Sequence, residues 1–168
     1  MQQALDTIYA PAGLHLTAGP LPEPESAQYH AFRLALNGAS VVYRAARTTP
    51  TKIGQFVTLW HRPDPVGPIA PLDSASDIAL AIVAVSDGAQ QGQFVFDRAT
   101  LLQRGIMSRA GVGGKRAIRV YPPWTRPIAR DAIATQNWQT RCFLPLDGSD
   151  TVALVRQLCA AILPGSAE

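Results

Sequence analysis

Arginine is the side chain that carries most of the potential chemistry in this sequence, and it is unevenly distributed. The chain has 15 Lys and Arg residues against 12 Asp and Glu. Residues 29–62 contain five cations and no acid, residues 63–97 five aspartates and no cation, and residues 98–141 nine cations and one acid. Guanidinium groups bind phosphate through paired hydrogen bonds and stack on flat rings. The two basic segments, 29–62 and 98–141, therefore predict a surface for a polyanion if they meet in the fold.

The alternative is that the two basic segments form separate solvated faces, which the aspartates of residues 63–97 neutralise. We favour the polyanion, because charges of opposite sign usually mix on a protein surface and here they are segregated along the chain. The charge pattern thus indicates a binding function.

Aromatic side chains lie inside the same basic segments. Strand alternation places Lys52, Phe56 and Trp60 on one face of a predicted strand. It places Arg119 beside Tyr121 on one face of another. Cations interleaved with rings are typical of sites for single-stranded nucleic acid, because arginine contacts phosphate while the bases stack on the rings. The alternative for each tryptophan is packing in the core.

The sequence offers little for an enzyme. Residues 111–115 (GVGGK) resemble a phosphate-binding loop, but that loop needs Gly where Arg109 stands and Ser or Thr where Arg116 stands. Neither lysine has an acidic residue two positions before it, as the nuclease pattern acidic-x-Lys requires. The three histidines and two cysteines lack the spacing of a zinc site. We therefore predict no catalytic residue, no metal ligand and no cofactor.

Two other functions stay open. A metal-dependent nuclease would use Glu25, Asp77 or Asp97, acids that lie outside the basic segments and whose spacing does not show that they converge. A binder of a small anionic metabolite would use Lys115 together with the backbone amides of the glycine-rich loop 111–114.

The elements that must position these side chains are both strands and helices. We predict helices over residues 1–10, 98–104, 127–143 and 151–163, and strands over 29–36, 39–47, 53–62, 78–85, 92–97 and 116–121. Asn37-Gly38, between the first two strands, is a strong signal for a tight hairpin turn. The proline-rich residues 14–26 are predicted to form a loop. This order of elements predicts one α/β (α+β) domain.

The composition is that of a globular protein. Its 168 residues suffice for one domain, and 47% hydrophobic against 16% charged residues argues against disorder. No apolar run approaches the roughly 18 residues of a membrane span, and the first residues lack the basic and apolar parts of a secretory signal. We expect a cytoplasmic protein without membrane contact, while the oligomeric state stays open.

Four stretches of sequence carry a longer pattern. They are residues 44–60 (RAARTTPTKIGQFVTLW), 92–96 (GQFVF), 114–124 (GKRAIRVYPPW) and 135–139 (TQNWQ). In this order they resemble the MepB family, and the resemblance covers most of residues 23–145. Two positions depart from the family pattern: Arg47 stands where lysine is expected, and Asp97-Arg98 where Pro-Lys is expected.

The resemblance implies a single domain over residues 1–168, with a MepB-like core at about 23–145 and a helical C-terminal element at about 151–163. It implies a fold like that of the PD-(D/E)XK nucleases, with a central mixed sheet flanked by helices. It also implies nucleic-acid binding without the catalytic residues of those nucleases, with a preference for RNA and single strands. The missing acidic-x-Lys pattern agrees with a non-catalytic member.

We therefore predict a non-catalytic protein that binds RNA or single-stranded DNA through a basic, aromatic-lined cleft. Gln139 has two interpretations, because it either braces the strands or points into the cleft. The side chains predicted to contact phosphate are Arg44, Arg47, Lys52, Lys115, Arg116 and Arg119. The predicted stacking surfaces are Trp60, Tyr121 and Trp124, and the amides of Gln55 and Gln139 complete the predicted site.

Overall fold

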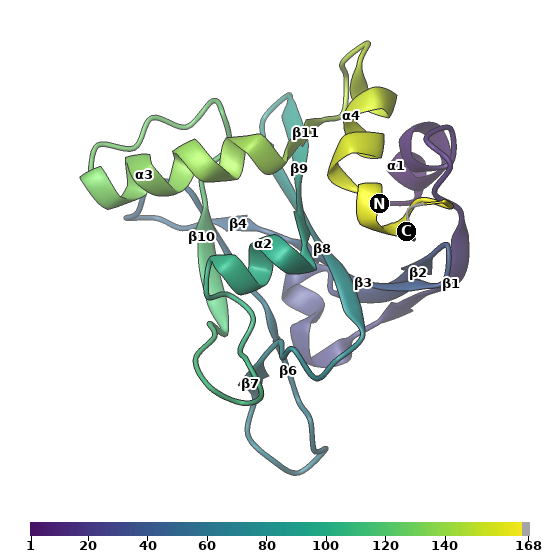
Figure 1. The fold of residues 1–168 in the computed structure, drawn as a ribbon. Helices are drawn as coiled ribbons and strands as arrows, with labels where there is room; N and C mark the ends of the chain where they lie inside the picture. Colours follow the sequence, from purple (N-terminus) through teal and green to yellow (C-terminus); the bar gives the residue numbers. More distant parts are fainter. Residues whose placement is uncertain (166–168) are drawn as a thin grey trace.

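The computed structural model describes residues 1–165, and a six-stranded mixed sheet lies at its centre (Figure 1). In spatial order the strands are β1 (Leu16–Pro22), β2 (Phe32–Leu36), β3 (Ala39–Ala45), β8 (Ile78–Asp87), β9 (Gln90–Asp97) and β11 (Phe143–Pro145). Neighbouring strands are antiparallel except β3 and β8, which are parallel. A parallel pair needs a long connection, and residues 46–77 form it. That connection contains much of the first basic segment.

Two smaller sheets involve this connection. β4 (Arg47–Thr48) and β5 (Gln55–Thr58) form a three-stranded sheet with β10 (Ala117–Val120), in the order β10-β5-β4. β6 (Trp60–His61) pairs with β7 (Ala70–Pro71). The single strand predicted over residues 53–62 is therefore interrupted at Leu59, and its two parts pair in different sheets.

The hairpin predicted at Asn37-Gly38 is confirmed. Asn37 and Gly38 both have positive φ, 50° and 82°, between the antiparallel strands β2 and β3. This backbone conformation matches the twist of the flanking strands, and asparagine and glycine are the residues that adopt it at least cost. The Asn37 side chain also donates to the carbonyl of Gly13 at 2.9 Å, which ties the turn to the N-terminal region.

The central sheet has a hydrophobic core on each face. On β8, Leu80 and Ile82 contribute to the first core, while Ala81 and Val83 contribute to the second, as strand alternation requires. Helices α1 (Gln2–Ala4) and α4 (Thr151–Leu158), the π-helical turn η1 (Leu5–Tyr9) and the 3₁₀ turn η4 (Ala160–Ile162) pack on the first face. The second face packs against α2 (Arg98–Gln103), β5 and β10, with residues of α3 (Arg130–Gln139) and η3 (Thr140–Cys142) at its border.

The prediction of a loop over residues 14–26 is wrong. This segment forms β1 and the start of the 3₁₀ helix η2 (Pro24–Tyr29). Proline lacks the N–H of a ladder hydrogen bond, but β1 is an edge strand, where one side of the backbone needs no partner. Pro20 and Pro22 are therefore compatible with this strand.

The helix predicted over residues 127–143 is shorter than expected. α3 begins at Arg130 and gives way to η3, and Phe143 already belongs to β11. The predicted α+β fold with a central mixed sheet and flanking helices is confirmed. None of the helices within residues 1–165 is long and apolar enough to cross a bilayer.

Candidate nucleic-acid interface

The sheet β10-β5-β4 brings the two basic segments into contact. Phe56 of β5 is the register partner of Arg47 on β4 and of Arg119 on β10. Direct partners in antiparallel strands project from the same face, so the three side chains form one row across the sheet. We call it the Arg47–Phe56–Arg119 row. Its two cations come one from each basic segment and are 72 positions apart (119 − 47).

Arg119 is held in place within this row. Its guanidinium carbon lies 6.0 Å from the centre of the Phe56 ring, and Nη1 donates to the Gly54 carbonyl at 3.1 Å. The same nitrogen lies 3.4 Å from the carbonyl of Lys52, whose own side chain is exposed. The Tyr29 ring packs against Phe56, with the two ring centres 6.2 Å apart. The row thus combines cations with aromatic rings.

A cavity of about 290 Å³ lies beside the free edge of β10, between that strand, α3 and the segment after α2. We call it the edge cavity. Three cationic side chains line it, Arg104, Lys115 and Arg119, and two large rings, Tyr121 and Trp138. The Arg104 guanidinium carbon lies 4.8 Å from the centre of the Trp138 ring. Of the described residues that line the edge cavity, none is acidic.

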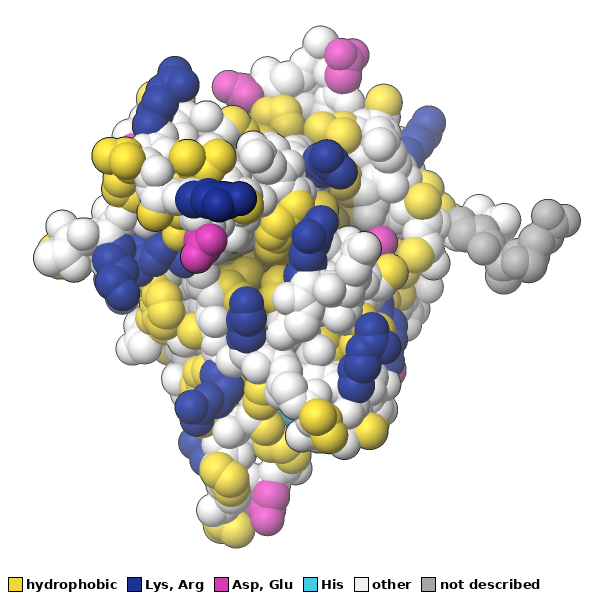
Figure 2. Space-filling view, turned by 60° about the vertical axis from the view of Figure 1, so that its left-hand side comes forward, with side chains coloured by type: hydrophobic (Ala, Val, Ile, Leu, Met, Phe, Trp, Pro, Cys, Tyr) yellow, Lys and Arg dark blue, Asp and Glu magenta, His cyan; other side chains and the backbone are white. Residues whose placement is uncertain are grey.

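Figure 2 shows the face that carries α3 and β10. Lys and Arg side chains surround a hollow in which hydrophobic side chains are exposed, and few acidic side chains appear on this face. No aspartate of residues 63–97 is among the described residues that line the edge cavity. The arrangement suits an anionic ligand that also has flat, apolar parts.

Gln139 braces the strand edge. It is buried, its Oε1 accepts from the Tyr121 backbone N–H at 2.8 Å, and its Nε2 donates to the Arg119 carbonyl at 3.0 Å. The side chain thereby satisfies the backbone of β10 where no further strand pairs with it. Of the two interpretations of Gln139, these hydrogen bonds fit the one in which the side chain braces the strands. The residue also borders the edge cavity.

Arg44 lies apart from the row. Strand alternation on β3 turns it toward the second face of the sheet, and only 1% of it is exposed. Its Nη2 lies 2.6 Å from a carboxylate oxygen of Glu23, and Nη1 donates to the Tyr43 carbonyl at 2.9 Å. Burial lowers the pKa of Arg44, and the Glu23 carboxylate opposes that shift. Its guanidinium is engaged inside the protein.

The remaining predicted residues are divided between surface and interior. Lys115 and Arg116 are exposed, and Tyr121 is half-buried at the edge cavity. Gln55 is buried and donates to the Ser86 carbonyl at 2.7 Å, away from the row. Trp124 is half-buried and packs edge-on against Phe143, with ring centres 5.7 Å apart.

Trp60 lines a different cavity, of about 400 Å³, in which carboxylates are present. Glu25 pairs there with Arg62 at 2.9 Å, and Glu23 pairs with Arg33 at 2.8 Å. The negative charges make this cavity a poorer phosphate site than the edge cavity.

The glycine-rich loop is occupied by an acid of the protein itself. The Asp73 carboxylate accepts from the Ser108 hydroxyl and, at 2.7 Å each, from the backbone N–H groups of Gly111 and Ala75. These hydrogen bonds, that of Ser108 first, lower the pKa of Asp73 to about 2. One backbone amide of the loop, that of Gly111, therefore already has an anionic partner.

The three acids considered for a nuclease have local roles or stand alone. Glu25 pairs with Arg62, and Asp97 caps α2 by accepting from the Thr100 N–H at 2.7 Å. Asp77 is exposed. In the part of the chain that the structure describes, no group of three or more His, Cys, Asp and Glu side chains is placed to hold a metal ion.

The predicted set of binding residues lacks four residues that the structure adds: Tyr29, Phe56, Arg104 and Trp138. For Phe56 the signal existed, because strand alternation placed it beside the cations. Arg104 and Trp138 are 34 positions apart (138 − 104), and no local pattern connects them.

Comparison with known proteins is consistent with this fold. A family model described as MepB-like matches residues 23–145. A solved structure named "Crystal Structure of MepB" is similar to this chain, with 31% sequence identity and a TM-score of 0.71. The alignment covers 80% of this chain and 87% of that one. No curated protein matches the chain.

Proposed function

This chain belongs to the MepB-like family. Because the sequence resemblance to that family implies nucleic-acid binding, we propose that the protein binds nucleic acid and favours RNA or single-stranded DNA. The proposed function is binding without cleavage, in the cytoplasm. The likeness to PD-(D/E)XK nucleases stays a prediction, because neither comparison bears on it.

The observation that carries the proposal is the Arg47–Phe56–Arg119 row. It joins cations from both basic segments on one sheet face, with a ring between them. Lys52 adjoins the row through its backbone, and its exposed side chain adds another positive charge. Such a surface can neutralise successive phosphates of one strand.

The edge cavity supports a preference for single strands. In a duplex the bases are stacked inside and cannot reach a ring on the protein surface. A single strand can turn a base out of its stack, and the half-buried rings of Tyr121 and Trp138 offer a place for it. Arg104, Lys115 and Arg119 would neutralise the neighbouring phosphates.

Fluorescence anisotropy tests the proposal with labelled RNA, single-stranded DNA and duplex DNA of matched sequence. We expect both single strands to bind more tightly than the duplex, and affinity to fall as salt rises. Each phosphate contact contributes a slope of about −0.7 in a plot of log affinity against log salt. Affinity that is flat with salt, or equal for single strands and duplex, would contradict the proposed mode.

Two controls separate the alternative functions. Incubation of the same oligonucleotides with magnesium or manganese ions tests for cleavage, and cleavage that Glu25→Gln, Asp77→Asn or Asp97→Asn abolishes would establish a nuclease instead. A free nucleotide that competes at the same concentration as an oligonucleotide would indicate a metabolite site. Under our proposal the oligonucleotide binds more tightly, because it contacts several cations at once.

A further inference from the structure

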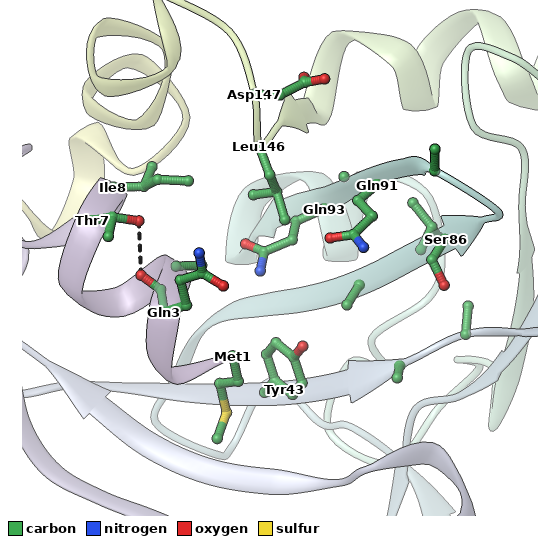
Figure 3. Close-up of a pocket in the computed structure, with 17 residues that line it drawn as sticks. Met1, Gln3, Thr7, Ile8, Tyr43, Ser86, Gln91, Gln93, Leu146 and Asp147 are labelled. Carbon is green, nitrogen blue, oxygen red and sulfur yellow. Dashed lines mark hydrogen bonds between the residues drawn. The ribbon is translucent and has the colours of Figure 1, made fainter.

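A third cavity, also of about 400 Å³, lies on the opposite face of the central sheet from the β10-β5-β4 sheet (Figure 3). It is bounded by α1 and η1, by the ends of β3 and β8, and by the beginning of β9. We call it the amide cavity, because glutamine side chains of two elements, α1 and β9, line it. It shares no lining residue with the edge cavity.

Small residues at its floor explain why the space is open. One row of register partners across β3, β8 and β9, the row that contains Tyr43, consists of large side chains that fill the first core. The next row on the same face is Ala45, Ala84 and Gln93. Two methyl groups fill much less space than the side chains of the preceding row, so the helical turns above do not close on the sheet. The floor is flat and apolar.

One buried amide points into this space. Gln93 is only 2% exposed, and its Oε1 accepts from the Tyr9 hydroxyl at 2.7 Å. That hydrogen bond orients the amide, and its Nε2 is a donor that a ligand in the cavity can use. An amide that is held in place by Tyr9 can meet a ligand without first being ordered.

Two further amides stand at the mouth of the cavity. Figure 3 shows the side chains of Gln3, Gln91 and Gln93 around the same space, from α1 on one side and β9 on the other. Each primary amide offers a donor and an acceptor side by side. The cavity therefore presents paired hydrogen-bonding groups above an apolar floor.

The side chains of the lining do not favour phosphate as the main recognition element. No lysine or arginine is among the described residues that line the cavity, and the single charged side chain there is the exposed carboxylate of Asp147. No cationic side chain of the lining can therefore pair with a phosphate group. The edge cavity has the opposite character, since its charged lining is cationic.

We propose that the amide cavity binds an uncharged nucleobase or nucleoside. The edges of purines and pyrimidines carry adjacent donors and acceptors, to which a glutamine amide can bind through two hydrogen bonds. A flat heterocycle can lie against Ala45 and Ala84, with its polar edge toward Gln93. The volume lies within the range of about 300–1,000 Å³ that is typical of small-molecule sites. This site is independent of the proposed nucleic-acid surface.

Calorimetric titration of the full chain tests the proposal with adenosine, guanosine, cytidine and uridine, with their 5′-monophosphates, and with ribose. We expect at least one nucleoside to bind, its monophosphate to bind no more tightly, and ribose not to bind. Absence of nucleoside binding at millimolar concentration would overturn the proposal, as would a monophosphate that binds more tightly than its nucleoside.

Neighbouring glutamines supply a matched pair of variants. Gln90 and Gln91 are both exposed on β9, but successive strand residues point to opposite faces, and only Gln91 lines the cavity. We expect Gln91→Ala to weaken nucleoside binding at least threefold and Gln90→Ala to leave it unchanged. Equal effects of the two variants would overturn the assignment.

A filling variant tests the location independently. Ala84→Leu occupies the floor and should abolish nucleoside binding while oligonucleotide binding persists. If circular dichroism shows that Ala84→Leu does not fold, the pair Gln90→Ala and Gln91→Ala decides. Loss of nucleoside binding in Lys115→Ala would place the ligand in the edge cavity and overturn the proposal, whereas failure of oligonucleotide binding alone would affect only the proposed function.

Discussion

The role of Arg119 gives the sharpest test of the proposed interface. Arg119→Gln removes one cation from the Arg47–Phe56–Arg119 row, together with the guanidinium that lies 6.0 Å from the centre of the Phe56 ring. Glutamine keeps an uncharged amide donor on a shorter side chain, and the backbone pairing of β10 with β5 does not depend on the side chain at this position. The variant therefore replaces the cation with a neutral polar group.

The expected effect follows from counterion release. Of the cations predicted from sequence to contact phosphate, all except Arg44 reach the surface: Arg119 is half-buried and the others are exposed. Loss of one phosphate contact should make the slope of log affinity against log salt less negative by about 0.7 for a single strand. Over a fourfold rise in salt, wild-type affinity should then fall roughly 2.6-fold further than that of the variant (4 to the power 0.7).

Anisotropy titrations at several salt concentrations measure this slope. Arg156→Gln serves as the control, because Arg156 lies on α4, on the other face of the central sheet, and donates to the Ala12 carbonyl at 3.2 Å. The reasoning is refuted if the slope for Arg119→Gln equals that of the wild type, or if Arg156→Gln changes it as much. An effect of Arg119→Gln on one sequence only would also contradict a phosphate contact.

Three further predictions concern residues whose roles the structure defines. Gln139→Ala should lower the free energy of unfolding by about 1–3 kcal/mol in urea titrations, because it removes two part-buried hydrogen bonds to the backbone of Arg119 and Tyr121; a loss below about 0.5 kcal/mol would contradict the bracing role. Arg44→Ala should destabilise the protein by about 1.5–3 kcal/mol, since it removes a charge-assisted hydrogen bond to Glu23, which keeps its pair with Arg33, while the salt slope of oligonucleotide binding stays unchanged; a smaller slope would instead assign Arg44 a phosphate contact. The pKa of Asp73 is about 2 in the folded protein against 3.8 without its hydrogen bonds from Ser108, Gly111 and Ala75. The contribution of Asp73 to stability is therefore present above pH 4 and is lost as pH falls toward 2. In urea titrations Asp73→Asn should lower stability at neutral pH and flatten this acid dependence, and an unaltered pH profile would refute the assignment.

Local features of the fold could be predicted from sequence with good accuracy. The Asn37-Gly38 turn, the buried strand at residues 78–85 and the short helix at residues 98–104 follow from backbone preferences and periodicity over a few residues. β1 could not be predicted in this way, because its prolines are acceptable only at the edge of a sheet. Whether a strand lies at an edge depends on pairing with distant residues.

The candidate site divides in the same manner. Alternation along residues 53–60 placed Phe56 with cations, and the structure sets Phe56 between Arg47 and Arg119, whereas Trp60 lies beyond the interruption at Leu59 and lines a different cavity. Alternation puts Arg44 and Arg47 on opposite faces of the predicted strand, but it could not show that Arg44 is buried against Glu23 while Arg47 is exposed. The difference arises because Glu23, which directly precedes η2, supplies the carboxylate that pairs with Arg44. The position of Glu23 is set by the whole fold.

By itself, the sequence determined the family, the two basic segments and the residue types available for contact with an anion. Those properties are composition and order, which exist before folding. Only the tertiary structure decided that β5 pairs with β10, which sets Arg119 beside Phe56, and that Arg104 reaches Trp138. Pairing between distant segments depends on the free energy of the entire packed chain, so no local pattern contains it.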